Sequence, residues 1–246
     1  MDSTQGFQQA AAHLDRVLAS AGARLSRLDE PSGGRVRLEV AGFEPASGRG
    51  ETLWRRRGLD DPAALTSVVP PDTVVERGPR RTARLLHVTL PVGRSTGEAA
   101  LRLLAKSVRG IFEGEQERAL SLSTALAEHR IDLGRVTALE DSLVIAPVTV
   151  PGAVELGKHC RTAAPESPWV RAGNVGWTEA ADFRSLLQVT LWLLTNSPEV
   201  MVVDLAPCTC CGHARPDRAR VVGLTPAAAA TFEDNLRRFA AAGTPR

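Results

Sequence analysis

The sequence predicts an α/β or α+β fold in which a mixed sheet is flanked by helices. Segments with apolar residues at helical spacing alternate along the chain with short runs typical of strands. Hydrophobic residues make up 43% and charged residues 24% of the 246 residues, as in ordinary globular domains, which excludes wholesale disorder and coiled-coil arrays. No apolar run reaches the length of a membrane-spanning helix, so we expect no membrane insertion.

The N-terminal part combines one helix with short strands. Apolar residues recur at helical spacing over 7–22 and predict an amphipathic helix. Residues 35–40 alternate between polar and apolar, which predicts a half-buried strand. Periodicity is weak over 44–83, where several Gly and Pro occur. We therefore expect two parts: 1–83, which could form a separate small lobe, and 84–246, the main α/β domain.

The main domain opens with a strand and two helices. Residues 84–90 predict a buried strand that Pro91 ends. Thr96 is a suitable N-cap for the long helix that follows, because its side-chain oxygen can accept a hydrogen bond from the first turn. Gly114 is expected to interrupt this helix, and a second helix is predicted over 115–130.

The last third of the chain has the clearest patterns. A strand is predicted over 142–150, and Thr178 is placed to cap a largely buried helix. The continuous apolar run over 199–205 is typical of a strand covered on both faces. A further strand is predicted over 218–224, and Pro226 opens the final helix.

Three of the four cysteines lie in one loop directly after the predicted strand at 199–205. Cys208, Cys210, Cys211 and His213 form the pattern C-x-C-C-x-H, and Cys160 could supply a further ligand from elsewhere in the chain. Thiolates and imidazoles are the usual ligands of structural zinc. The spacing is tight, so binding of one ion by all three loop thiolates is not expected. The loop predicts a metal site, with zinc as the metal.

Other interpretations of the same loop stay open. A redox-active thiol would need a lowered pKa and a partner thiol within reach, and no C-x-x-C motif is present. An enzyme could use the loop as a metal-dependent or reactive-thiol site, with Asp204 nearby at the end of a strand. The cysteines could also be ordinary small apolar residues of a loop.

Arginine is unusually frequent, because lysine occurs only at Lys106 and Lys158. A GC-rich bacterial genome produces this bias. The run Trp54-Arg55-Arg56-Arg57 could bind phosphate or stack on a base. The net charge of +2 argues against bulk attraction to nucleic acid, so we expect an exposed basic loop there. His87, inside an apolar strand, is expected to be a core histidine.

The sequence lacks phosphate-binding glycine loops, a nucleophile elbow and an H-E-x-x-H helix. Few cysteines and no recognisable secretion signal favour the cytoplasm. The leading hypothesis is a cytoplasmic accessory protein that interacts with another protein and holds zinc in the cysteine loop. The alternatives are an enzyme that uses this loop and an arginine-mediated binder of nucleic acid or phosphate.

Overall fold

The computed structural model describes residues 3–43, 50–78, 85–92, 96–162, 180–203 and 219–243. Within these residues it has eight helices and two four-stranded antiparallel sheets. The predicted class, helices flanking β-structure in a mixed α/β fold, is confirmed, although the chain builds two sheets where the sequence suggested one. Among the described helices none is long and apolar enough to cross a membrane. Contacts divide the chain into two compact units, 1–117 with 138–140 and 118–137 with 141–246.

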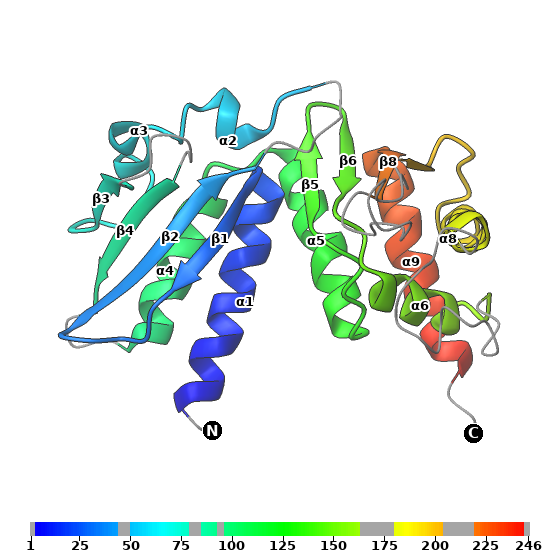
Figure 1. Ribbon diagram of the computed structural model, residues 1–246, viewed down its shortest axis with the longest axis horizontal. Coiled ribbons are helices and arrows are strands. Elements are labelled where there is room, and N and C mark those ends of the chain that lie inside the picture. Colours follow the sequence, from blue (N-terminus) through cyan, green and yellow to red (C-terminus); the bar gives the residue numbers. More distant parts are fainter. Residues whose placement is uncertain are drawn as a thin grey trace, which may run out of the picture. The chain divides into compact units, whose positions relative to one another are not determined.

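Unit 1 contains a four-stranded antiparallel sheet with the strand order β1-β2-β4-β3 (Figure 1). Its elements are α1 (Ser3–Ala21), β1 (Ala23–Leu28), β2 (Arg35–Gly42), α2 (Leu53–Arg56), α3 (Pro62–Thr66), β3 (Val74–Arg77), β4 (Leu85–Pro91) and α4 (Gly97–Arg109). The N-cap prediction at Thr96 is confirmed, because its side chain accepts a hydrogen bond of 3.2 Å from the Ala99 amide.

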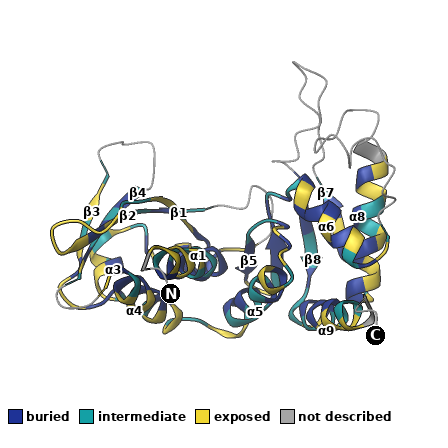
Figure 2. Cartoon of the chain, turned by 90° about the horizontal axis from the view of Figure 1, so that it is seen from below, coloured by how far each residue is buried: buried dark blue, intermediate teal, exposed yellow. Residues whose placement is uncertain are grey.

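One face of the unit 1 sheet is buried and the other is open. Val36, Leu38 and Val40 of β2 point into the core, whereas Arg35 and Arg37 are exposed. This is the alternation that the sequence shows over 35–40. Helices α1 and α4 cover the buried face, and neither lies on the opposite face (Figure 2). The polar half of β2 therefore faces outward.

That residues 1–83 form an independent lobe stays a prediction. In the structure the strands that flank position 83, β3 and β4, pair with each other in register from Val74↔Thr89 to Arg77↔Leu86. Residues from both sides of position 83 therefore belong to one sheet.

Unit 2 carries most of the second sheet, which has the strand order β5-β6-β8-β7. The elements are α5 (Gly114–Glu128), β5 (Val136–Leu139), β6 (Ser142–Ile145), α6 (Val150–His159), α8 (Ala180–Thr195), β7 (Met201–Val203), β8 (Arg220–Leu224) and α9 (Pro226–Gly243). The predicted strand over 142–150 is shorter than expected, because the chain turns at Pro147 and α6 begins at Val150. Thr178 lies outside the described residues.

The two sheets share one topology, although no repeat is visible in the sequence. In each, a helix precedes the first strand, helices separate the second strand from the third, and a helix follows the fourth strand. In each, the strands lie in the order first, second, fourth, third. This topology requires matching patterns of apolar residues rather than matching identities, so sequence comparison of the halves does not reveal it.

The apolar run over 199–205 predicted a strand covered on both faces, but β7 lies at the edge of its sheet and its Met201 is 49% exposed. Among the described strands, β7 pairs only with β8. The side-chain amide of Gln188 in α8 covers the backbone there. It donates to the Val200 carbonyl at 2.6 Å and accepts from the Val202 amide at 3.0 Å. Gln188 thus makes contacts that a further strand would make, which protects the edge.

A Gln188→Ala variant is expected to lose about 1–2 kcal/mol of unfolding free energy, because the Val202 amide is left buried without its acceptor. Urea unfolding followed by circular dichroism measures this loss. Arg184→Ala is the matched control, since Arg184 is exposed on the same helix. Equal stability of the two variants would contradict the role of Gln188.

Candidate functional site

The cysteine loop lies outside the residues that the structure describes. This holds for Cys208, Cys210, Cys211 and His213, and also for Asp204. Within the described part of the chain, no group of three or more His, Cys, Asp or Glu side chains is arranged to hold a metal ion. The zinc site therefore stays a prediction from the sequence.

Cys160 is the one cysteine within the described ranges, and it is buried at the end of α6. Its exposed fraction is 4%, and burial raises the pKa of the thiol to about 12. The thiol is therefore neutral at neutral pH, unlike the exposed thiolate that redox chemistry needs. Neighbouring His159 contacts the Leu236 carbonyl at 3.0 Å, and its ring centroid lies 4.9 Å from that of His129. Burial, and secondarily the charge of His159, lower the pKa of His129.

The arginine run after Trp54 is engaged in contacts within unit 1. Trp54 is 1% exposed, and its indole nitrogen donates to Asp60 at 3.0 Å. Arg56 and Arg57 both contact the carboxylate of Glu113. A buried tryptophan cannot stack on a base, so this feature gives no support to nucleic-acid binding.

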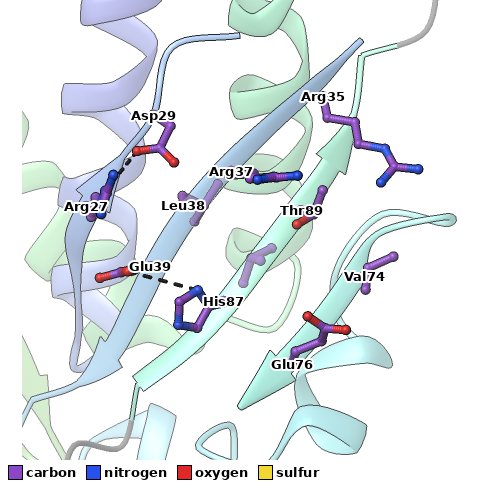
Figure 3. A pocket seen from close by; sticks show the side chains of 11 residues that line it. Arg27, Asp29, Arg35, Arg37, Leu38, Glu39, Val74, Glu76, His87 and Thr89 are labelled. Carbon is purple, nitrogen blue, oxygen red and sulfur yellow. Dashed lines mark hydrogen bonds and ion pairs between the residues drawn. The ribbon is translucent and has the colours of Figure 1, made fainter. Parts of the chain in front are cut away.

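The outer face of the unit 1 sheet contains a shallow cavity, which we call the outer-face hollow (Figure 3). Its volume is about 460 Å³. All four strands or their ends contribute side chains, and most of these are charged (Figure 3). The lining residues are Arg27, Asp29, Arg35, Arg37, Leu38, Glu39, Val74, Glu76, His87, Val88 and Thr89.

Strand register places the polar side chains of the hollow in rows across the sheet. In the first row, Arg27 lies opposite Glu39, Glu39 opposite His87, and His87 opposite Glu76. Residues directly opposite on one face lie about 5 Å apart between Cβ atoms. His87 is therefore placed between two carboxylates. Its Nδ1 lies 4.0 Å from a Glu39 oxygen.

The second row has a positive charge, that of Arg37, beside the uncharged Thr89. Arg37 lies opposite Thr89, Thr89 opposite Val74, and the Asp29 amide donates to the Arg37 carbonyl at 2.9 Å. Arg35 precedes Arg37 by two residues in β2 and therefore lies on the same face of the sheet. The hollow thus has a basic end at Arg35 and Arg37, and an acidic end at Glu39 and Glu76 of the first row.

Several charges of the hollow have no partner in the part of the chain that the structure describes. Arg27 pairs with Asp29 at 2.8 Å. Among the described residues, however, no ion pair or side-chain hydrogen bond involves Arg35, Arg37 or Glu76. Unpaired charges of both signs around a cavity are available to a ligand.

The expectation that His87 is a core histidine is wrong. Its side chain is 39% exposed and belongs to the outer face, because its neighbours Leu86 and Val88 take the buried positions of β4. Its Nε2 is buried beside Gly78 and has no hydrogen-bond partner in the described part of the structure. The sequence contained a signal for this site, namely the polar half of the alternation in β2 and β4.

An exposed apolar stripe lies on α8 in unit 2. Val189, Trp192 and Leu193 occupy adjacent positions at helical spacing, and each is 46% exposed. The Trp192 indole donates to the Val200 carbonyl at 3.2 Å, which holds the ring against the edge strand. Exposed apolar side chains that gather on one surface are typical of protein-binding faces.

No family model matches the chain, and neither a curated protein nor a solved structure does.

Proposed function

We propose that this chain is an accessory protein that binds another polypeptide, and that the outer-face hollow of unit 1 holds the partner. The observation that carries the proposal is the cavity of about 460 Å³ lined by Arg35, Arg37 and Glu76, whose side chains have no partner among the described residues. Cavities that bind small organic molecules are mostly apolar, whereas the lining here is mostly charged. Charged groups of both signs give a protein interface its specificity and its register.

Affinity capture from a lysate of the source cells tests the proposal. The wild type is compared with Arg35→Gln/Arg37→Gln, which removes two charges from the hollow. The control, Arg102→Gln/Lys106→Gln, removes two exposed charges from α4 on the opposite layer of the unit. We expect at least one protein to be retained by the wild type and the control and depleted tenfold or more by the hollow variant. Equal retention by all three proteins would refute the role of the hollow.

We further propose that the accessory protein acts in the cytoplasm and that its cysteine loop holds zinc through His213 and thiolates drawn from Cys208, Cys210 and Cys211, with Cys160 as a further candidate ligand. The support is the ligand chemistry and the clustering in the sequence. The alternative hypothesis is an enzyme that uses this loop as a metal-dependent or reactive-thiol site. Four protein ligands correspond to a closed structural site, whereas three ligands and a water correspond to a catalytic site.

Elemental analysis of the purified protein is expected to show stoichiometric zinc. A Cys208→Ser/Cys211→Ser variant should lose the metal, and a chelator should lower the Tm of the wild type but not of that variant, because ligands that bind only in the folded state stabilise it. A protein free of zinc, iron and copper would eliminate the metal site. Thiol reactivity at neutral pH that disappears in Cys208→Ser would instead favour the hypothesis of an enzyme with a reactive thiol in this loop.

A further inference from the structure

We propose that the occupant of the outer-face hollow is an extended polypeptide segment of mixed charge, with an acidic side chain at Arg35 and Arg37 and a basic side chain at Glu39 and Glu76. This inference rests on the proposed function and adds the chemistry of the partner. It follows from the separation of the charges in the hollow and from Arg35, Arg37 and Glu76, whose side chains have no partner within the described ranges.

Strand geometry gives the spacing between the two charged ends. Arg37 and Glu39 lie two residues apart on one face of β2, or about 7 Å between Cα atoms, and Arg35 lies about 14 Å from Glu39. Glu76 lies two strands away from β2, and strands are about 4.8 Å apart. The ends are thus separated by roughly 7–14 Å.

An extended polypeptide has the same spacing. Side chains on one side of a strand recur every two residues, about 7 Å apart, so positions two or four residues apart reach both ends of the hollow. The hollow therefore selects a segment in which an acidic residue and a basic residue are two or four positions apart.

The basic end suits a carboxylate. Arg35 and Arg37 present guanidinium groups on the same side of β2, and the close-up shows both reaching toward β4 (Figure 3). A guanidinium binds a carboxylate through two parallel hydrogen bonds, which fixes its orientation as well as its position. Neither group gives up an internal ion pair within the described structure when a ligand binds.

The acidic end argues against a nucleic-acid strand. A phosphate backbone that followed the two arginines would meet Glu39 and Glu76 in the same cavity, and also Asp29. Like charges at such distances are repulsive, and a polyphosphate has no cationic group to compensate. A basic side chain of a polypeptide instead pairs with Glu76, which lies on edge strand β3 and is exposed.

Selection from a display library of random 12-residue peptides tests the inference. The full-length wild type is expected to enrich peptides in which an acidic and a basic residue are two or four positions apart. Arg35→Gln/Arg37→Gln should abolish the preference for the acidic residue, and Glu76→Gln should weaken the preference for the basic one. Arg102→Gln/Lys106→Gln should select the same peptides as the wild type. Affinity of a selected peptide should fall at least fivefold between 50 mM and 500 mM salt.

The outcomes separate this inference from the proposed function. Enriched peptides without paired charges, or with acidic residues only and no response to Glu76→Gln, would overturn the mixed-charge inference and leave polypeptide binding in place. Binding of a single-stranded oligonucleotide that competes with every selected peptide would also overturn it. No enrichment by the wild type would contradict the proposed function itself.

Discussion

A Gly152→Ala variant is expected to lose at least about 2 kcal/mol of unfolding free energy. Gly152 lies in the first turn of α6, where a Cβ atom would be 1.8 Å from the Asp132 carbonyl oxygen and 2.7 Å from the Leu133 Cα. These neighbours are backbone atoms, so no side-chain rotation relieves the contact. The helix would have to move away from the segment before β5, and its N-cap Thr149, which accepts from the Gly152 amide, would lose its hydrogen bond to the Asp132 carbonyl.

Urea unfolding followed by circular dichroism measures this loss. Gly114→Ala is the matched control, because Gly114 begins α5 and a Cβ there meets nothing within 4 Å. We expect this control to be neutral or slightly stabilising. A Gly152→Ala protein as stable as the wild type would show that α6 does not pack against residues 132–133.

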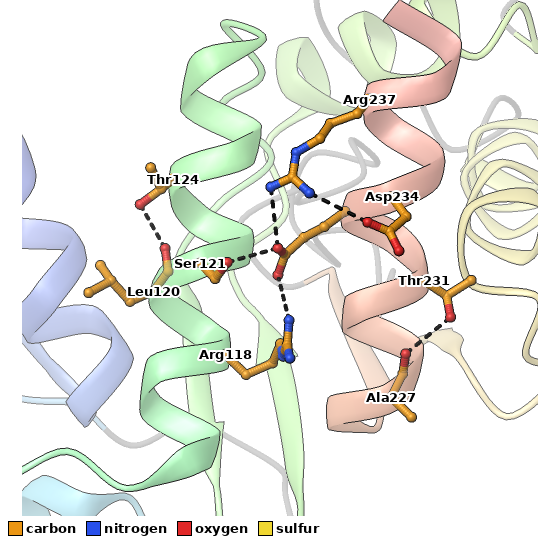
Figure 4. A network of polar contacts seen from close by, with 9 residues as sticks. Arg118, Leu120, Ser121, Thr124, Ala227, Thr231, Asp234 and Arg237 are labelled. Atoms are coloured by element: carbon orange, nitrogen blue, oxygen red, sulfur yellow. Dashed lines mark hydrogen bonds and ion pairs between the residues drawn. The ribbon is translucent and has the colours of Figure 1, made fainter.

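Removing the Glu233 carboxylate is expected to cost about 2–3 kcal/mol, because it leaves the half-buried Ser121 and Arg118 and the exposed Arg237 without their partner and takes a buried side chain out of the packing. Glu233 on α9 is 3% exposed, and its contacts with Ser121 and Arg118 join α9 to α5. Figure 4 shows these two α5 side chains and Arg237 of α9 pointing into the space between the two helices. It accepts a hydrogen bond of 2.8 Å from Ser121 and lies 3.6 Å from Arg118 and 3.7 Å from Arg237. Both arginines keep access to solvent, which holds the cost below that of a fully buried pair.

Glu233→Ala and Asp234→Ala form a matched pair for this measurement. Asp234 is the next residue of α9, and its side chain is 67% exposed in an ion pair with Arg237. Its removal should change the unfolding free energy by no more than about 0.5 kcal/mol. Similar losses for the two variants would contradict the view that burial makes Glu233 important.

The sequence predicted those elements whose signals are local. The helix over 7–22, the cap at Thr96 and the helix start at Pro226 follow from apolar spacing, from a side chain that satisfies a helix end and from the fixed backbone angle of proline, and the structure confirms them within a few residues. The environment of the strand at 199–205 was predicted wrongly, because an apolar run does not show that Met201 faces solvent or that β7 lies at the edge of its sheet. Gln188, which covers that edge, comes from a different helix.

The outer-face hollow was not predicted, although its residues were visible in the sequence. Arg35, Arg37 and Glu39 formed the polar half of an alternating strand, and such residues usually face only solvent. They become a site because β4 lies beside β2 and brings His87 and Thr89 next to them. That pairing joins residues about fifty positions apart in the chain, and no local pattern encodes it. The cysteine loop, the clearest pattern in the sequence, lies outside the described residues and stays a prediction.

The most direct test of the central claim is a photo-cross-linking measurement in the source cells. A photoreactive phenylalanine analogue replaces Thr89 in the hollow or, as the control, Lys106 on exposed α4. After irradiation, mass spectrometry of the products should identify a polypeptide joined at position 89, through a segment with acidic and basic residues, and not at position 106. The Arg35→Gln/Arg37→Gln background should remove that product. The absence of any product at position 89, or the same product at both positions, would contradict the account.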